Sequence, residues 1–156
     1  MPMIRILAAL AVVVALPNAH ADSELRDRFI AASQDMGESM MKAVKACAPE
    51  IDISGIDFEY TPRMVEATEC VVETHIERFG RAETEALVEQ AEAMSERSFS
   101  SLQEMTMLQQ DYPALSSPEL VEINQNCGTL EASSDLPMNR VMRENMSQLA
   151  ACFSQQ

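Results

Sequence analysis

The stretch Thr61–Gly80, with the sequence TPRMVEATECVVETHIERFG, carries the signals of a complete amphipathic helix. Thr61 is a favoured N-cap residue, Pro62 suits the first helical turn, and Gly80 suits a helix end. Between these ends, apolar residues recur at helical spacing and predict the inner face. They are Val65, Val72, Ile76 and Phe79. We therefore expect a helix here that packs one face against the rest of the molecule.

The segment before this helix shows the same periodicity. A first helix is expected to begin near Asp22 or Ser23, either of which can cap it, and to be closed by Pro49. Residues 48–61 predict a loop whose apolar side chains pack back on the core. The buried stripe of the first helix is predicted to consist of Leu25, Phe29, Ala32, Met36, Met40, Ala43 and Cys47.

Two helical segments are expected next in the chain. Residues 81–111 carry apolar residues at helical spacing, and the run at residues 98–101 is expected to bend or split this helix because Ser and Phe are middling helix formers. Ser116–Glu119 opens a short fourth helix, which is expected to stop at Gly128.

The C-terminal segment completes the fold. Residues 129–135 predict a polar turn, and a last helix is expected to start near Asp135. Its inner side would carry Met138, Met142, Leu149 and Cys152. No segment alternates as a strand does. The sequence thus predicts an all-α fold, a single disulfide-stapled helical bundle of about five helices.

The pattern of residues 1–21 predicts a secretory signal peptide. A basic start at Arg5 precedes an apolar run over residues 6–16 and the small-residue site Ala19–Ala21. That run is shorter than the roughly 20 residues of a spanning helix, so we expect cleavage and no membrane insertion afterwards. Residues 22–156 would then form one all-helical domain in the periplasm or outside the cell.

Four cysteines lie beyond this segment: Cys47, Cys70, Cys127 and Cys152. An even number in an exported chain predicts two disulfides. A zinc site is disfavoured because the nearest two cysteines are 23 residues apart, and no C-x-x-C motif indicates thiol exchange. Three pairings are possible. The two halves of the chain are weakly similar: in each, a helix ends at a cysteine, and a loop and a further helix lead to a second cysteine. This similarity favours the pairs Cys47–Cys70 and Cys127–Cys152. The second pair is the harder to form, because Cys152 lies about 23 Å along its helix from Pro137. The turn before this helix would have to double back to bring Cys152 beside Cys127.

The charge of the chain excludes some classes of partner. The net charge is −14, and like-charge repulsion disfavours nucleic acid and anionic membrane surfaces. Two acidic rows lie at helical spacing. They are Glu66, Glu69, Glu73 and Glu77, and Glu85, Glu89, Glu92 and Glu96. These rows either solvate the surface or form a face for a basic partner.

No catalytic motif is recognisable in the sequence. His75 is the one histidine left after cleavage, no G-x-S-x-G motif surrounds a serine, and the chain lacks tryptophan. His75 is expected to be a solvated or salt-bridged surface residue, the alternative being a pH-sensitive contact. We expect neither enzymatic activity nor a cofactor.

Methionine is unusually frequent, with 12 residues in the chain. Five of them share helix faces and are candidates for a ligand groove: Met36, Met40, Met138, Met142 and Met146. Three interpretations remain open, namely core filling, an apolar binding groove and Cu(I) ligation by thioethers. The sequence therefore predicts an exported, non-catalytic protein that binds a protein partner, with charge favouring a basic one. The alternative is a carrier of a small apolar molecule or of Cu(I).

Overall fold

The computed structural model describes residues 19–99 and 101–154, and all regular structure in them is helical. These described residues form eight α-helices and one short 3-10 helix, η1. In chain order they are α1 (Ala19–Cys47), α2 (Pro62–Phe79), α3 (Arg81–Ser95), α4 (Leu102–Asp111), η1 (Pro113–Ser116), α5 (Pro118–Asn126), α6 (Thr129–Ser133), α7 (Pro137–Glu144) and α8 (Met146–Ser154). The predicted all-α, disulfide-stapled class is confirmed. None of these helices combines the length and apolarity needed to cross a bilayer. Most of the predicted signal peptide, residues 1–18, lies outside the described residues.

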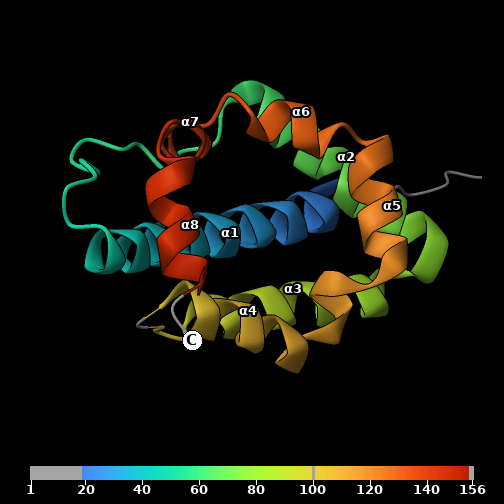
Figure 1. Ribbon diagram of the computed structural model, residues 1–156. Helices are drawn as coiled ribbons and strands as arrows, with labels where there is room; N and C mark the ends of the chain where they lie inside the picture. Colours follow the sequence, from blue (N-terminus) through green and yellow to red (C-terminus); the bar gives the residue numbers. More distant parts are fainter. Residues whose placement is uncertain (1–18, 100, 155–156) are drawn as a thin grey trace, which may run out of the picture.

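The long helix α1 runs through the middle of the molecule, and the other helices are arranged around it (Figure 1). α2 and α3 pack along it, while α8 crosses its C-terminal half. α5 and α6 pack on α2, on the side of the molecule away from α8. This arrangement leaves α1 in contact with both parts of the core.

Buried side chains form two main groups. The first, which we call the α1–α8 cluster, gathers Met41, Ala43, Val44, Ala48, Ile51, Phe99, Leu102, Leu108 and Leu149. The second, the α2–α5 cluster, consists of Val71, Leu87, Leu120 and Ile123. Phe29 of α1 packs against this second cluster and also against Leu25, Val72 and Val88. Burial of such apolar side chains is the main force that holds helices of this length together.

Arginine side chains fix α1 against its two neighbours. Arg28 makes a bidentate contact with Glu92 of α3, with both N–O distances at 2.7 Å. Arg26 reaches Glu69 of α2 at 3.0 Å, so part of each predicted acidic row holds helices together rather than facing a partner. The hydrogen bonds from Arg28 lower the pKa of Glu92, as expected for a carboxylate beside a cation.

The helix signals around Thr61–Gly80 are confirmed. The Thr61 side chain accepts a hydrogen bond from the backbone N–H of Met64, and Gly80 ends α2 with a φ of 88°. The inner face is only partly as predicted. Val72 is buried as predicted. Phe79 is 41% exposed, because the buried face of α2 is formed by Val72 together with Val71 and Thr68.

Three boundaries differ from the sequence expectation. α1 already includes Ala19, so Asp22 lies inside its first turn rather than at its cap. The expected turn at residues 129–135 is largely the helix α6, which follows Gly128 in a left-handed conformation and buries Ala132. The expected last helix is two helices, because Asn145 directs its side-chain amide to the Val141 carbonyl and leaves helical geometry.

The break predicted within residues 81–111 is confirmed. α3 ends at Ser95 and α4 begins at Leu102, and Phe99 between them is buried in the α1–α8 cluster. Ser100 lies outside the described residues. The short fourth helix also begins as expected, with Ser117 accepting a hydrogen bond from the N–H of Leu120.

The predicted disulfide pairing is wrong. The structure joins Cys47 to Cys152 and Cys70 to Cys127, with Cα–Cα distances of 5.9 and 5.7 Å. The prediction assumed that each half of the chain closes on itself. Instead, the end of α1 packs against α8 and the middle of α2 packs near the end of α5, so each bridge joins helices that are distant in sequence.

Candidate functional site

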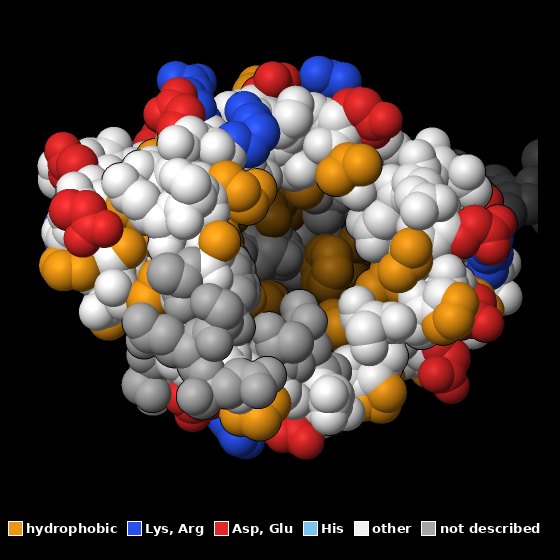
Figure 2. Space-filling view, viewed as in Figure 1, with side chains coloured by type: hydrophobic (Ala, Val, Ile, Leu, Met, Phe, Trp, Pro, Cys, Tyr) orange, Lys and Arg blue, Asp and Glu red, His pale blue; other side chains and the backbone are white. Residues whose placement is uncertain are grey.

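A hollow of about 430 Å³ opens at the surface between α1, α2, α5 and α6. Figure 2 shows this face of the molecule, where hydrophobic side chains gather inside and around the recess. Phe29 and Ser33 of α1 line it, and so does Tyr60, which precedes the N-cap residue of α2. α2 contributes Met64, Thr68 and Val71. α5 and α6 contribute Val121, Asn124, Gln125, Thr129, Leu130 and Ser133. The hollow volume is within the range of ligand pockets.

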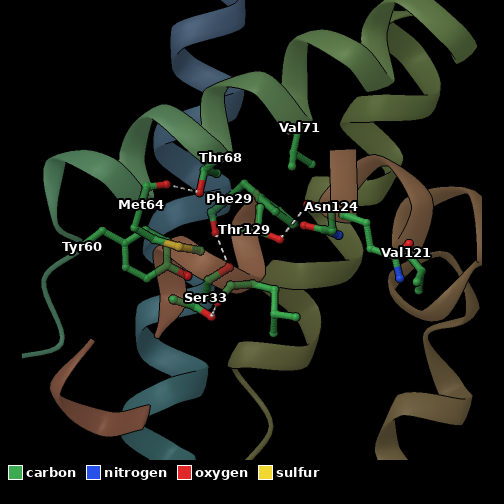
Figure 3. Close-up of a pocket in the computed structure, with 12 residues that line it drawn as sticks. Phe29, Ser33, Tyr60, Met64, Thr68, Val71, Val121, Asn124 and Thr129 are labelled. Carbon is green, nitrogen blue, oxygen red and sulfur yellow. Dashed lines mark hydrogen bonds between the residues drawn. The ribbon is translucent and has the colours of Figure 1, made fainter. Parts of the chain in front are cut away.

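The serine and threonine hydroxyl groups that line the hollow donate to nearby backbone carbonyls. Ser33 donates to the Phe29 carbonyl at 2.8 Å, and Thr68 donates to the Met64 carbonyl at 2.8 Å (Figure 3). Thr129 donates to the Asn124 carbonyl at 3.1 Å. Because these donors are satisfied within the protein, the lining presents mainly methyl, methylene and aromatic carbon to anything that enters.

No charged side chain is among the described residues that line the hollow, although the chain as a whole carries a charge of −14. Among the described lining residues, only Tyr60 is titratable. Burial raises the Tyr60 pKa, and a hydrogen bond with Ser33 acts in the opposite direction, so the phenol is neutral at ordinary pH. The hollow therefore favours an uncharged, apolar group over an ion.

The rim of the hollow is apolar as well. Val121 of α5 is 47% exposed and Leu130 of α6 is 72% exposed. Exposed apolar side chains that gather at a pocket mark a candidate binding site. Two apolar side chains of the lining are thus also exposed on the outside of the protein.

The five methionines predicted to form a groove lie elsewhere. Met40, Met138 and Met142 pack against the α1–α8 cluster, Met36 is partly buried and Met146 is exposed. Gly37 makes room for Met138, since a Cβ there would lie 3.2 Å from its sulfur. None of the five lines the hollow, and Met64 is the methionine among its described lining residues. That these five bind a ligand stays a prediction.

His75 differs from its predicted environment. The side chain is half-buried rather than solvated, and Nδ1 lies 2.8 Å from the hydroxyl of the buried Thr84. The His75 and Phe79 rings lie 4.7 Å apart between centroids. Burial lowers the His75 pKa and nearby Glu83 partly opposes this effect. In the described part of the chain, no three or more His, Cys, Asp or Glu side chains gather as metal ligands would.

The sequence did not indicate the hollow because its lining comes from four helices and a loop. One signal was available: the apolar residues in 48–61 were expected to pack back on the body of the molecule. They do so, with Ile51 buried in the α1–α8 cluster and Tyr60 at the hollow. The exposed Val121 and Leu130 carry no such signal, because single surface hydrophobic residues are common.

Comparison of this chain with known protein families, with curated proteins and with solved structures gives no match.

Proposed function

We propose that this chain is an exported, non-catalytic binding protein, and that an apolar part of a partner protein enters the hollow between α1, α2, α5 and α6. The observation that carries this proposal is that Phe29, Val121 and Leu130 line one hollow, and that Val121 and Leu130 are exposed at its rim. A pocket for a small ligand encloses most of that ligand. An open hollow with an apolar rim instead suits a side chain presented by a larger surface.

The negative charge favours a basic partner. At −14, the protein attracts cationic surfaces at long range, which raises the rate of association and makes it sensitive to salt. The uncharged hollow adds a contact that salt does not weaken. We therefore expect association to slow at high ionic strength, while dissociation changes little.

The test is site-specific photo-cross-linking in the producing cells. A photo-reactive amino acid at position 130 replaces an exposed leucine at the rim, and the same residue at position 42 replaces an exposed lysine of α1 that does not line the hollow. We expect a protein-sized adduct from position 130 and none from position 42. Equal adducts from both positions would contradict docking at the hollow.

A matched pair of variants tests the chemistry of the hollow. Val121→Asp places a charge at the rim of a neutral cavity, whereas Val121→Thr keeps the side-chain shape without a charge. Because Val121 is 47% exposed, neither change should unfold the protein. We expect the position-130 adduct to disappear with Val121→Asp and to persist with Val121→Thr.

A second candidate is a carrier of a small uncharged apolar molecule, favoured by the hollow volume of about 430 Å³. Native mass spectrometry of the protein from its own cells separates the two candidates. A bound mass of a few hundred daltons that is lost in Val121→Asp identifies the carrier. A protein adduct at position 130 without such a mass identifies the protein binder.

A further inference from the structure

A second cavity, of about 270 Å³, lies away from the central hollow, where α2, α3, η1 and α5 meet. The described residues that line it are all different from those that line the hollow. Leu87 and Ala114 are its aliphatic residues, and Phe79 adds a ring that is 41% exposed. The remaining lining residues are polar: His75, Glu83, Ser117 and Glu119. The volume suits a group of side-chain size rather than a drug-sized ligand.

The hydrogen bonds of Thr84 assign the proton on His75. The Thr84 hydroxyl donates its single hydrogen to the Gly80 carbonyl at 3.0 Å. The same oxygen lies 2.8 Å from His75 Nδ1, so it accepts a hydrogen bond there and Nδ1 carries the proton. In the neutral ring Nε2 is then left as an acceptor, and no described residue hydrogen-bonds to it.

The other polar groups of the cavity are also acceptors. The Ser117 hydroxyl donates to the Ala114 carbonyl, so its hydrogen is already used. Neither Glu83 nor Glu119 lies in an ion pair with a described lysine or arginine, in contrast to Glu122 nearby, which pairs with Arg78 at 3.1 Å. The described lining thus combines two carboxylates with an imidazole nitrogen, and no side-chain donor is left over.

We propose that this cavity binds a protonated amine or guanidinium carried on an apolar stem, the chemistry of a lysine or arginine side chain. Ammonium and guanidinium groups are donors without acceptor capacity, and they complement a lining that offers acceptors. The stem packs on Leu87 and Ala114, and the exposed Phe79 ring, which lines the same cavity, supplies an aromatic partner for the cation. This site is independent of the central hollow and goes beyond the proposed function.

Helix dipoles reduce the charge of the site without cancelling it. Glu83 and Glu119 each lie in the first turn of a helix, where a carboxylate interacts favourably with the helix end. A helix end carries only about half a positive charge, against a full negative charge on each carboxylate. The cavity therefore keeps a negative potential that selects cations over anions.

The test uses the imidazole signals of His75 in the ¹⁵N-labelled protein. His75→Gln assigns the signals, because they are absent from that variant. The probes are n-butylammonium and n-butylguanidinium, with n-butanol and butyrate as stem controls. We expect saturable shifts of the His75 signals with the two cations and none with the controls. Equal shifts with n-butanol, or none with either cation, would overturn the proposal.

Paired variants distinguish cation binding in the cavity from non-specific attraction by the net negative charge of the protein. Glu83→Gln with Glu119→Gln should weaken cation binding about tenfold or more, because both charges at the site are removed. Glu89→Gln with Glu144→Gln removes two exposed carboxylates elsewhere and should change binding by less than about twofold. Equal weakening by the two pairs would show non-specific attraction and overturn the site. Melting temperatures verify that both pairs are folded.

Two further arms distinguish the source of the cation and the independence of the site. A blocked Gly-Lys-Gly peptide that binds about tenfold tighter than n-butylammonium identifies a protein side chain as the occupant, and equal affinity identifies a free amine. Val121→Asp should leave the His75 response unchanged. If Val121→Asp abolishes the adduct at position 130 while no cation shifts the His75 signals, only the cation site fails.

Discussion

Cys47 and Cys152 are joined although they are 105 residues apart, so one disulfide ties the end of α1 to α8. The second bridge, Cys70–Cys127, ties α2 to the end of α5. Cys152 packs against the α1–α8 cluster and Cys127 against the α2–α5 cluster. Each part of the core therefore has its own covalent link, and the hollow lies on the side of the Cys70–Cys127 bridge, between α2 and α5.

Removing either bridge should lower the free energy of unfolding by about 4 kcal/mol, since both close long loops in the unfolded chain. The two double alanine variants, at Cys47 with Cys152 and at Cys70 with Cys127, should differ in a second property. Loss of Cys70–Cys127 loosens the wall of the hollow and should weaken binding of the neutral apolar dye N-phenyl-1-naphthylamine. Urea unfolding and dye fluorescence measure these effects. Mass mapping of non-reduced peptides verifies the pairing.

The local signals of the sequence predicted their elements because they act over a few residues. Thr61 caps α2 through Met64 only three residues away, and Gly80 ends it through its own backbone conformation. Ser117 caps α5 in the same way. Such contacts form whatever the rest of the chain does, so the order and the type of these helices followed from the sequence.

Long-range pairings could not be predicted in this way. Which helix meets Cys47 depends on how α8 returns across α1, and this return depends on the break at Asn145 between α7 and α8. Asn145 donates to the Val141 carbonyl from both its side chain and its backbone at that break, and nothing in the apolar periodicity signals it. The hollow is missed for the same reason, because its walls come from four helices that meet only in three dimensions.

Arg28 and Glu92 should contribute measurably to the packing of α3 on α1. Because both side chains are about one-third exposed, solvent screens the pair, and we expect Arg28→Gln to cost about 1 kcal/mol or less. The Glu92 pKa is lowered in the folded state, so this contribution is present above the unfolded pKa near 4.5 and is lost as pH falls through the folded value. Urea unfolding at pH 7 and pH 3 measures the change. A double-mutant cycle with Glu92→Gln isolates the pair, and an Arg28→Gln effect of equal size at both pH values would contradict the assignment.

Thr84 of α3 is fully buried. Its hydroxyl hydrogen-bonds both the Gly80 carbonyl, at the end of α2, and the His75 ring. Thr84→Val keeps the shape but leaves His75 Nδ1–H without its acceptor, so we expect a loss of about 1 to 2 kcal/mol in the free energy of unfolding. The tautomer should also shift, with the proton moving partly to Nε2. Thr84→Ser keeps the hydroxyl and should keep the Nδ1–H tautomer despite some loss of packing. ¹⁵N spectra of the imidazole report the tautomer directly, and an unchanged spectrum in Thr84→Val would refute the assigned hydrogen bond.

His75 should make the stability of the protein sensitive to mild acid. Burial lowers its folded-state pKa below the ordinary value of 6.5, with Glu83 opposing the shift. The unfolded chain therefore binds the proton more readily, and the free energy of unfolding should fall as pH drops from 6.5 through the folded-state pKa. Above 6.5 the residue is neutral in both states and contributes no slope.

We expect His75→Gln to flatten the dependence of the free energy of unfolding on pH between about pH 7 and pH 5, relative to the parent protein. Glu89→Gln is the control and should retain the parent slope, because it removes an exposed carboxylate and leaves His75 in place. Urea unfolding at several pH values gives the slopes, and parallel curves for His75→Gln and the parent would rule out His75 as the source.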